Sequence, residues 1–166
     1  MADALVNFFQ NLNVSDELVV FLVSMFPIVE LRGAVPLGVM MEMNPWILLS
    51  LAVLGNILPV PFIILLARPI VNFCLKTKPL RSFGNWVQNK VEKNSEKVLR
   101  YEVWGLFLFV ASPLPGTGAW TGSLIAALLD LRLKKAFPAI CIGVVAAGLI
   151  MIFGSNIVKF IVEMFI

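Results

Sequence analysis

Four long apolar segments constrain the fold of this chain more than any other feature of its sequence. Their bounds are Leu18–Met41, Pro45–Ala67, Val103–Leu129 and Ala136–Val158. A helix of about 20 apolar residues crosses the hydrocarbon core of a bilayer, so each segment is long enough to span a membrane. A soluble domain is about one-quarter charged, whereas this chain is 14% charged and 60% hydrophobic, with a mean hydropathy of +0.94. The sequence therefore predicts an all-α integral membrane protein.

The first and third segments differ from the others because proline and glycine cluster in their middles. The residues concerned are Pro27, Gly33, Pro36 and Gly38 in the first segment and Pro113, Pro115, Gly116, Gly118 and Gly122 in the third. Proline has no N–H, and lipid cannot satisfy the carbonyl groups that such breaks set free. We therefore predict that each segment is a re-entrant hairpin. Its two helical limbs, of roughly 10–12 residues each, would meet near the middle of the membrane.

The second and fourth segments are predicted to be plain membrane-spanning helices. Asn44 can cap the second one, with Pro45 in its first turn. Asn56 lies inside this segment close to Pro59 and Pro61. The prolines predict a kink, and Asn56 is a further candidate for a polar contact.

The start of the chain is expected to form a short amphipathic helix in the headgroup region of the membrane. Apolar residues recur there at helical spacing, namely Leu5, Phe8, Phe9 and Leu12. No basic residue precedes them, so a cleaved secretory signal is not expected. Asn13 or Ser15 is expected to cap the helix that follows.

The two halves of the chain resemble each other. Phe26–Gly38 can be laid on Ser112–Leu124, and Leu54-Gly55 on Ile142-Gly143, with two extra residues in the second half. A hairpin plus one span crosses the membrane once, so the second half would enter from the opposite face. We expect a single membrane domain over 1–166, with inverted repeats over 1–67 and 103–166 joined by a basic connection over 68–102. Many transporters are built in this way, with the site where the repeats meet.

Basic residues gather in two connections, which the hairpin topology places on one side of the membrane. Residues 68–102 contain eight of the thirteen lysines and arginines, and residues 130–135 contain three more. Cytoplasmic loops collect such residues, so both connections are predicted to be cytoplasmic and both termini to lie outside. The long connection carries Leu80, Phe83, Val87, Val91 and Val98 at helical spacing. This spacing indicates an amphipathic helix at the membrane surface, either simply solvated or in contact with anionic lipid.

Glu30 and Arg32 are the only charged residues well inside the apolar segments. A charge at that depth is costly and is a candidate for function by default. Glu30 could exchange a proton during a transport cycle, and Arg32 could hold a phosphate or carboxylate through two parallel hydrogen bonds. The alternative is structural, because the two charges could simply neutralise each other.

The second hairpin contains the sequence Pro113-Leu-Pro-Gly-Thr-Gly-Ala-Trp-Thr-Gly122, which includes Thr117, Trp120 and Thr121. Two hydroxyl groups, exposed amides and a helix N-terminus after the glycines suit an anion. The alternative is close packing, because Gly118, Gly122 and Ala126 form a stripe of small residues that lets helices approach.

The absence of histidine excludes imidazole proton relays and nucleophile pairs that need a histidine, and it removes nearly every zinc site. Cys74 and Cys141 lie far apart and do not indicate a disulfide framework. We therefore expect neither an enzyme, nor a cofactor, nor a metal site. The basic connection lacks the interleaved aromatic residues of a nucleic-acid surface, so no nucleic-acid partner is expected.

Two motifs in order, Glu30-Leu-Arg-Gly-Ala-Val-Pro-Leu-Gly38 and Pro113–Gly122, resemble those of the small multidrug export protein family. The resemblance covers nearly the whole chain. More distantly, the chain resembles the DedA/VTT superfamily, which implies two facing re-entrant hairpins and transport of lipid-linked phosphates such as undecaprenyl phosphate. Phe26-Pro27 and Glu30 match the acidic first hairpin of DedA proteins. The arginines of their second hairpin are missing, since Ser112 or Pro113 and Gly118 stand there.

Three functional hypotheses follow. The first is a proton-coupled transporter of the plasma membrane that moves an anionic lipid or a small anion, with Arg32 as the ligand and Glu30 as the proton carrier. The second is export of lipophilic cations in exchange for protons at Glu30. The third is a structural membrane protein without a substrate. The expected partners are membrane lipid and a small-molecule or lipid-phosphate substrate, and a homodimer is one assembly to consider.

Overall fold

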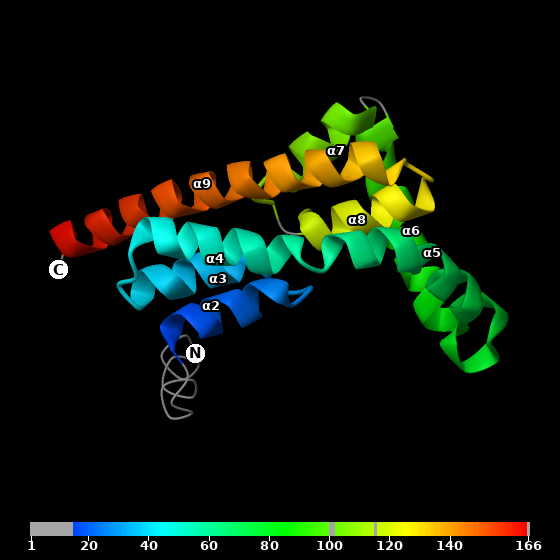
Figure 1. The fold of residues 1–166 in the computed structure, drawn as a ribbon, viewed down its shortest axis with the longest axis horizontal. Coiled ribbons are helices and arrows are strands. Elements are labelled where there is room, and N and C mark those ends of the chain that lie inside the picture. Colours follow the sequence, from blue (N-terminus) through cyan, green and yellow to red (C-terminus); the bar gives the residue numbers. More distant parts are fainter. Residues whose placement is uncertain (1–14, 100–101, 115, 166) are drawn as a thin grey trace. The chain divides into compact units, whose positions relative to one another are not determined.

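The computed structural model describes residues 15–99, 102–114 and 116–165, and these residues form helices joined by short connections (Figure 1). No strand occurs among them. The amphipathic helix expected around Leu5–Leu12 lies outside the described residues. The helices are α2 (Asp16–Met25), α3 (Glu30–Met40), α4 (Pro45–Ile57), α5 (Val60–Lys76), the short 3-10 helix η1 (Lys78–Leu80), α6 (Arg81–Leu99), α7 (Glu102–Ala111), α8 (Ala119–Leu128) and α9 (Leu133–Phe165).

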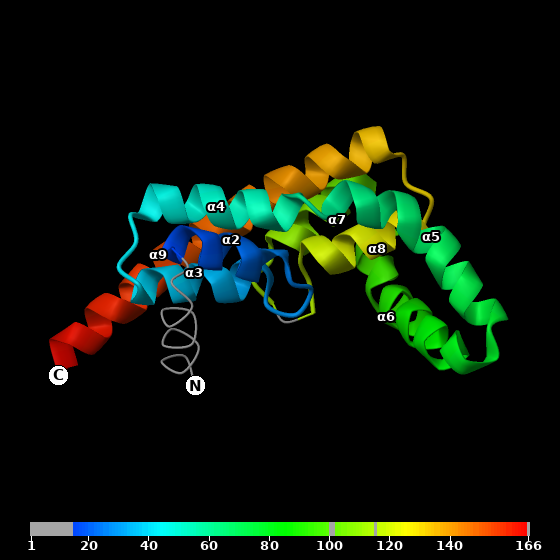
Figure 2. The ribbon, with the colours of Figure 1, turned by 60° about the horizontal axis from the view of Figure 1, so that its bottom comes forward.

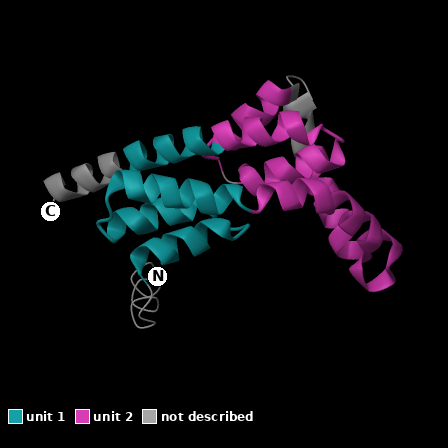
Figure 3. Cartoon of the chain, viewed as in Figure 1, with its two compact units in different colours: residues 1–58, 144–166 teal, residues 59–143 magenta. Residues whose placement is uncertain are grey.

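The chain divides into two compact units, coloured separately in Figure 3. Unit 1 comprises residues 1–58 and 144–166, and unit 2 comprises residues 59–143. Helix α9 contributes its first part to unit 2 and the rest to unit 1. This division concerns compactness and does not test the repeats predicted over 1–67 and 103–166, which stay a prediction.

In unit 1, α2 and α3 form a helical hairpin that packs on α4. Ser15 caps α2, since its hydroxyl accepts a hydrogen bond from the Leu18 amide at 3.4 Å, and Asn44 caps α4 through the Trp46 amide at 3.0 Å. Both caps were predicted from the sequence. The limbs of the hairpin have 10 and 11 residues, within the predicted range.

Glycines allow the helices of unit 1 to approach closely. The Cα of Gly55 in α4 lies against the Phe21 carbonyl and the Ser24 hydroxyl of α2, where a Cβ would overlap both oxygens. Gly38 of α3 gives room in the same way to Leu48 of α4. Gly148 lets α9 pack against Leu31 and Leu49. Close packing at small residues therefore occurs in unit 1 as well, where the sequence analysis did not predict it.

In unit 2, α7 and α8 form the second helical hairpin, and α8 packs on α5 and α6. Its limbs have 10 residues each. Gly122 of α8 contacts α7, because a Cβ there would lie 2.7 Å from Val110 Cγ2. Figure 2 shows α5 and α6 running side by side. Val87 and Val91 are buried in α6, whereas Leu80 and Phe83 are exposed. The predicted amphipathic helix is therefore present and its buried stripe packs against protein, while its place at the membrane surface stays a prediction.

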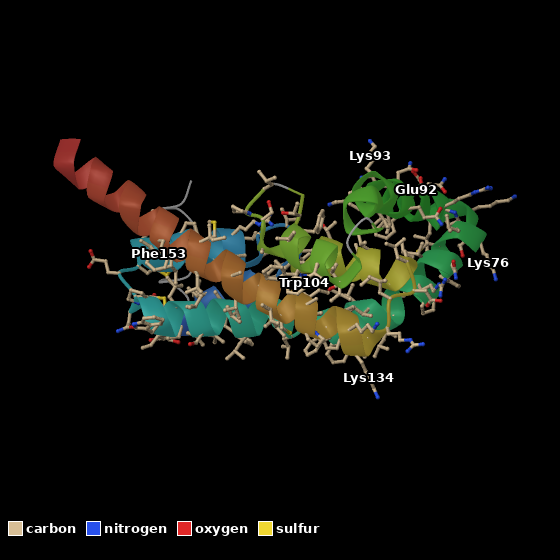
Figure 4. All side chains as sticks on the ribbon, turned by 90° about the horizontal axis from the view of Figure 1, so that it is seen from above. Lys76, Glu92, Lys93, Trp104, Lys134 and Phe153 are labelled. Atoms are coloured by element: carbon tan, nitrogen blue, oxygen red, sulfur yellow. The ribbon has the colours of Figure 1, made fainter. Side chains whose placement is uncertain are left out.

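Two helical stretches among the described residues are long and apolar enough to cross a membrane: Pro45–Lys76, with 32 residues, and Leu133–Ser155, with 23 residues. The first combines α4 and α5, which are separated by a two-residue break at Leu58–Pro59, close to the prolines for which the sequence predicted a kink. Figure 4 shows charged side chains such as Lys76, Glu92 and Lys93 on α5 and α6, and Lys134 at the start of α9. The chain is thus an all-helical membrane protein, whereas re-entrant hairpins and inverted repeats stay predictions.

Two differences between the observed helices and the predicted segments concern α5 and the first hairpin. Helix α5 continues nine residues past the predicted end at Ala67, because Val71 and Cys74 extend the buried stripe of Val60, Ile64 and Ala67. In the first hairpin, the break lies at Phe26–Val29, and Pro36 sits inside α3 without ending it.

Candidate functional site

Buried polar side chains gather at one end of unit 1. Among the described residues of this unit, three polar side chains are buried, namely Ser24, Glu30 and Asn56. Ser24 lies in the last turn of α2, Glu30 begins α3, and Asn56 lies in the last turn of α4. We call these three residues the polar layer.

The contacts between the helices bring the members of the polar layer to one level. Ser24 touches Gly55, the neighbour of Asn56. Gly38 of α3 touches Leu48 of α4, and the two helices run in opposite directions because only residues 41–44 join them. Glu30 lies eight residues before Gly38, and Asn56 lies eight residues after Leu48. At about 1.5 Å per residue, both are displaced by about 12 Å in the same direction. Glu30 therefore lies level with Asn56.

Glu30 is held at a sharp reversal of the chain. Its amide donates to the Phe26 carbonyl at 2.9 Å, which closes the turn that contains Pro27. Its φ is +51°, in the left-handed region that residues with a side chain seldom adopt. Its side chain is 5% exposed. A buried carboxylate in a strained backbone conformation costs free energy on two counts, and such strain is typical of functional sites.

Arg32 lies next to this position and is half-buried. Glu30 is close enough to attract its guanidinium electrostatically. This attraction is compatible with both interpretations of the two charges, the functional one and the structural one. The hydrogen-bonding group that distinguishes the site is Asn56, whose buried Oδ1 has no hydrogen-bond partner among the described residues.

The loop of the second hairpin is closed by its own threonine. The Thr117 hydroxyl is placed to donate to the carbonyls of Ser112 and Leu114, each at 2.8 Å. Gly116 and Gly118 have φ of +84° and +124°, which only glycine adopts without strain. Helix α8 begins after Gly118 without a side-chain cap. The hydroxyl hydrogen of Thr117 thus serves the loop, whereas the first amides of α8 lack a capping side chain.

The predicted site residues fall into two groups. Pro27, Glu30, Arg32, Gly33, Pro36, Gly38 and Asn56 belong to unit 1, and Pro113, Gly116, Thr117, Gly118, Trp120, Thr121 and Gly122 belong to unit 2. Pro115 lies outside the described residues. Gly122 and Thr121 are buried in the packing of α8, and Trp120 is partly buried. Within unit 1, the structure brings Glu30, Arg32 and Asn56 to the same end of the helices.

Ser24 was not among the predicted residues. It is a single hydroxyl in an apolar helix, and its hydrogen bond to the Phe21 carbonyl at 2.7 Å is an ordinary local contact. Only the register between α2 and α4, set at Gly55, reveals that it belongs to the polar layer. The sequence signal that could have found it is the pairing of a serine with a glycine on the facing helix.

Apolar helices long enough to span a bilayer and a buried carboxylate in a helical hairpin define the class of the molecule, an integral membrane protein. Residues 30–150 match the family model described as "Putative small multi-drug export protein", and the chain belongs to this family. Comparisons with curated proteins and with solved structures find no match. The more distant resemblance to the DedA/VTT superfamily is therefore not shown.

Proposed function

We propose that this protein is a proton-coupled membrane transporter that exports small molecules, with Glu30 as the group that exchanges protons with the solution. The observation that carries the proposal is the burial of Glu30 at a left-handed position in the turn of a helical hairpin. A structural staple would not require a carboxylate at a place where glycine fits without strain. Ionisable groups inside membrane helices commonly form proton or substrate pathways.

The family supports the same class of function, since its description names small multi-drug export. Under this proposal the protein is a transporter and not an enzyme. A lipophilic cation and a proton would compete for the Glu30 carboxylate, so that entry of one releases the other. Proton uptake from the outside would then drive export of the cation.

The proposed architecture is a pair of inverted repeats, each with a re-entrant hairpin and one span. Helical limbs of about ten residues reach about 15 Å, the middle of a hydrocarbon core. The basic connections would face the cytoplasm and the termini would lie outside the cell membrane, because lysine and arginine collect on the cytoplasmic side.

An anionic substrate is the second candidate, and one observation favours it. Arg32 is half-buried at the same hairpin and could hold a phosphate or carboxylate. Its guanidinium is already attracted by Glu30, so an anion would have to displace that carboxylate. None of the comparisons supports a lipid-linked phosphate in particular.

The test is uptake into liposomes that contain the purified protein and carry a pH gradient, with a lipophilic cation and an organic anion as separate probes. For the wild type we expect uptake of the cation, and for Glu30→Gln the rate of empty liposomes. Glu42→Gln is the matched control, because Glu42 is an exposed acid of the same unit. Glu30→Gln protein that transports as well as the wild type would overturn the proposal.

Arg32→Ala separates the two kinds of substrate in the same assay. A cation exporter should keep or improve its rate, because a repelling charge has been removed. An anion transporter should lose its activity, and Arg32→Lys should weaken it because lysine lacks the planar pair of donors.

A further inference from the structure

The starting observation is the side-chain oxygen of Asn56. Asn56 is 3% exposed, and its Oδ1 atom is buried without a hydrogen-bond partner among the described residues. Buried acceptors in folded proteins nearly always find a donor, since an unmade hydrogen bond costs free energy. Asn56 Oδ1 therefore lacks a hydrogen-bond donor among the described residues.

The polar layer indicates where this donor comes from. The Ser24 hydroxyl does not supply it, because its hydrogen goes to the Phe21 carbonyl. Helix α4 carries no charged residue, and Pro59 and Pro61 after it have no N–H to offer. Glu30 lies at the level of Asn56 on the neighbouring helix. Once its carboxyl group is protonated, it has an O–H to donate.

We propose that Asn56 accepts a hydrogen bond from the protonated carboxyl group of Glu30, so that the two side chains together form the proton-binding site of unit 1. This inference rests on the proposed function, since it takes Glu30 as the group that exchanges protons. In the step, the Glu30 carboxylate takes a proton from a hydronium ion and leaves a water molecule. The new O–H then donates to Asn56 Oδ1, and release of the proton reverses both events.

The surroundings of Glu30 make its protonation state depend on few groups. Arg32 is the charged side chain at this end of unit 1 among those described, and it attracts the carboxylate. Asp16 and Glu17 lie at the opposite end of α2, and Glu42 follows the far end of α3. The residues of α9 in unit 1 whose side chains the structure describes, 144–155, include no charged residue. Asn56 thus stabilises the protonated form of Glu30, whereas Arg32 stabilises its ionised form.

Asn56 is accordingly a positioning residue, and its effect is measurable without transport. The probe is the infrared absorption of protonated carboxyl groups in the full-length protein in lipid nanodiscs, followed over a pH titration. The band that disappears in Glu30→Gln belongs to Glu30. In Asn56→Leu we expect this band to shift, because the O–H has lost its acceptor. Its pH midpoint should fall by about one unit, a tenfold weaker proton affinity, which is the size of one ordinary hydrogen bond.

Ser24→Ala is the matched control, because it changes a buried residue of the same layer without removing the acceptor. Its Glu30 band should keep the wild-type position and midpoint.

Asn56→Leu with an unchanged band and midpoint would overturn the inference while leaving the proposed function intact. If no band disappears in Glu30→Gln at any pH, Glu30 does not take up protons, and the proposed function fails as well. A sodium-dependent change of stability that Asn56→Leu removes, with the Glu30 band unchanged, would assign the oxygen to a bound cation and overturn the inference.

Thermal stability gives a second measurement, and Asn56→Ala replaces the leucine variant if that protein does not fold. In alkaline solution, where Glu30 is ionised, the difference in unfolding temperature between the wild type and Asn56→Ala reflects packing and the loss of the amide group, without the proposed hydrogen bond. In acidic solution the wild type gains the hydrogen bond, so its stability relative to Asn56→Ala should increase. A stability difference that is equal at both pH values indicates a purely structural asparagine and contradicts the inference.

Discussion

The hairpin of unit 1 with its following helix, α2–α3–α4, and the hairpin of unit 2 with the start of α9 share backbone contacts. Gly55 of α4 packs on the Phe21 carbonyl, and Gly143 of α9 packs on the Phe107 carbonyl, with 3.0 Å between that oxygen and a Cβ built on Gly143. Both α3 and α8 end in the same hydrogen-bonded cap, with an acidic residue, Glu42 or Asp130, at positive φ. These contacts are what two copies of one scaffold would retain.

The chemistry of the two regions differs. At the left-handed turn the first region has Glu30, whereas the second has glycine. Laying Phe26 on Ser112 sets Glu30 against Gly116, and laying Gly55 on Gly143 sets it against Gly118. Laying Gly55 on Gly143 sets Asn56 against Val144, which is buried and apolar. In the second region the chain reverses with unstrained glycine. The first region keeps a strained, buried carboxylate, which indicates that the proposed proton chemistry resides there.

The comparison predicts an all-or-none result in topology mapping. If the halves are inverted copies, cysteines introduced at Lys90 and Lys134 should be protected from an impermeant reagent in intact cells, and one at Gln10 should react. The background is a variant in which Cys74 and Cys141 are replaced by serine. The physical reason is the collection of basic residues on the cytoplasmic side. Reaction at position 134 without reaction at 90 would restore four full spans and remove the inverted repeat.

The glycine contacts predict the next largest effect. Gly55→Ala should lower the free energy of unfolding by about 3 kcal/mol, because the new methyl group overlaps backbone oxygen that cannot move aside. Gly143→Ala should cost about 1 kcal/mol, since the neighbours there are less crowded.

Thermal unfolding in detergent measures both changes. Gly154→Ala is the control, because Gly154 lies in α9 with no atom within 4 Å of a built Cβ, and alanine there should be neutral or slightly stabilising. Equal costs at positions 55 and 143 would contradict the difference between the two interfaces.

A third prediction concerns the left-handed turns. Glu30→Gly and Glu30→Ala both remove the carboxylate, so the difference between them isolates the backbone. The glycine variant should be more stable by about 1 kcal/mol, because φ is +51° there. Gly116→Ala should destabilise by about 1 kcal/mol through its φ alone, since nothing lies within 4 Å of a built Cβ. Chemical unfolding of the four proteins, wild type included, checks this, and equal stability of Glu30→Gly and Glu30→Ala would show that the turn is not strained.

Local signals explain why much of the fold was predictable. Ser15 and Asn44 cap helices as their residue types suggest, Pro27 lies in the turn after α2, and Pro59 lies in the break between α4 and α5. Each of these features depends on one or two neighbouring residues, so the sequence contains the information. The electrostatic attraction between Glu30 and Arg32 likewise depends on residues close together in the sequence.

Features that depend on the register between helices were not predictable. The burial of Ser24 follows from its contact with Gly55, and the level of Asn56 follows from the contact between Gly38 and Leu48. Neither contact can be derived from one helix alone. The extension of α5 beyond Ala67 has a similar origin, because α8 and α6 cover its further turns. The positive φ of Glu30 contradicts the residue's own preference, so only the surrounding structure specifies it.

The smallest expected effect concerns the caps after α3 and α8. Glycine is the preferred residue at such a left-handed position, so Glu42→Gly should raise the free energy of unfolding by up to about 1 kcal/mol. Asp130→Gly should gain less, for two reasons. Aspartate tolerates positive φ better than glutamate, and Asp130 Oδ1 lies 2.6 Å from Arg68 Nη1 in an ion pair that the variant would lose. The side chains of this pair are 49% and 75% exposed, so its contribution is below about 1 kcal/mol and screened by salt.

Chemical unfolding at low and at about 1 M salt measures both variants. High salt should narrow the difference in stability gain between Glu42→Gly and Asp130→Gly, because it screens the ion pair. A larger gain in stability for Asp130→Gly than for Glu42→Gly at low salt would contradict this prediction.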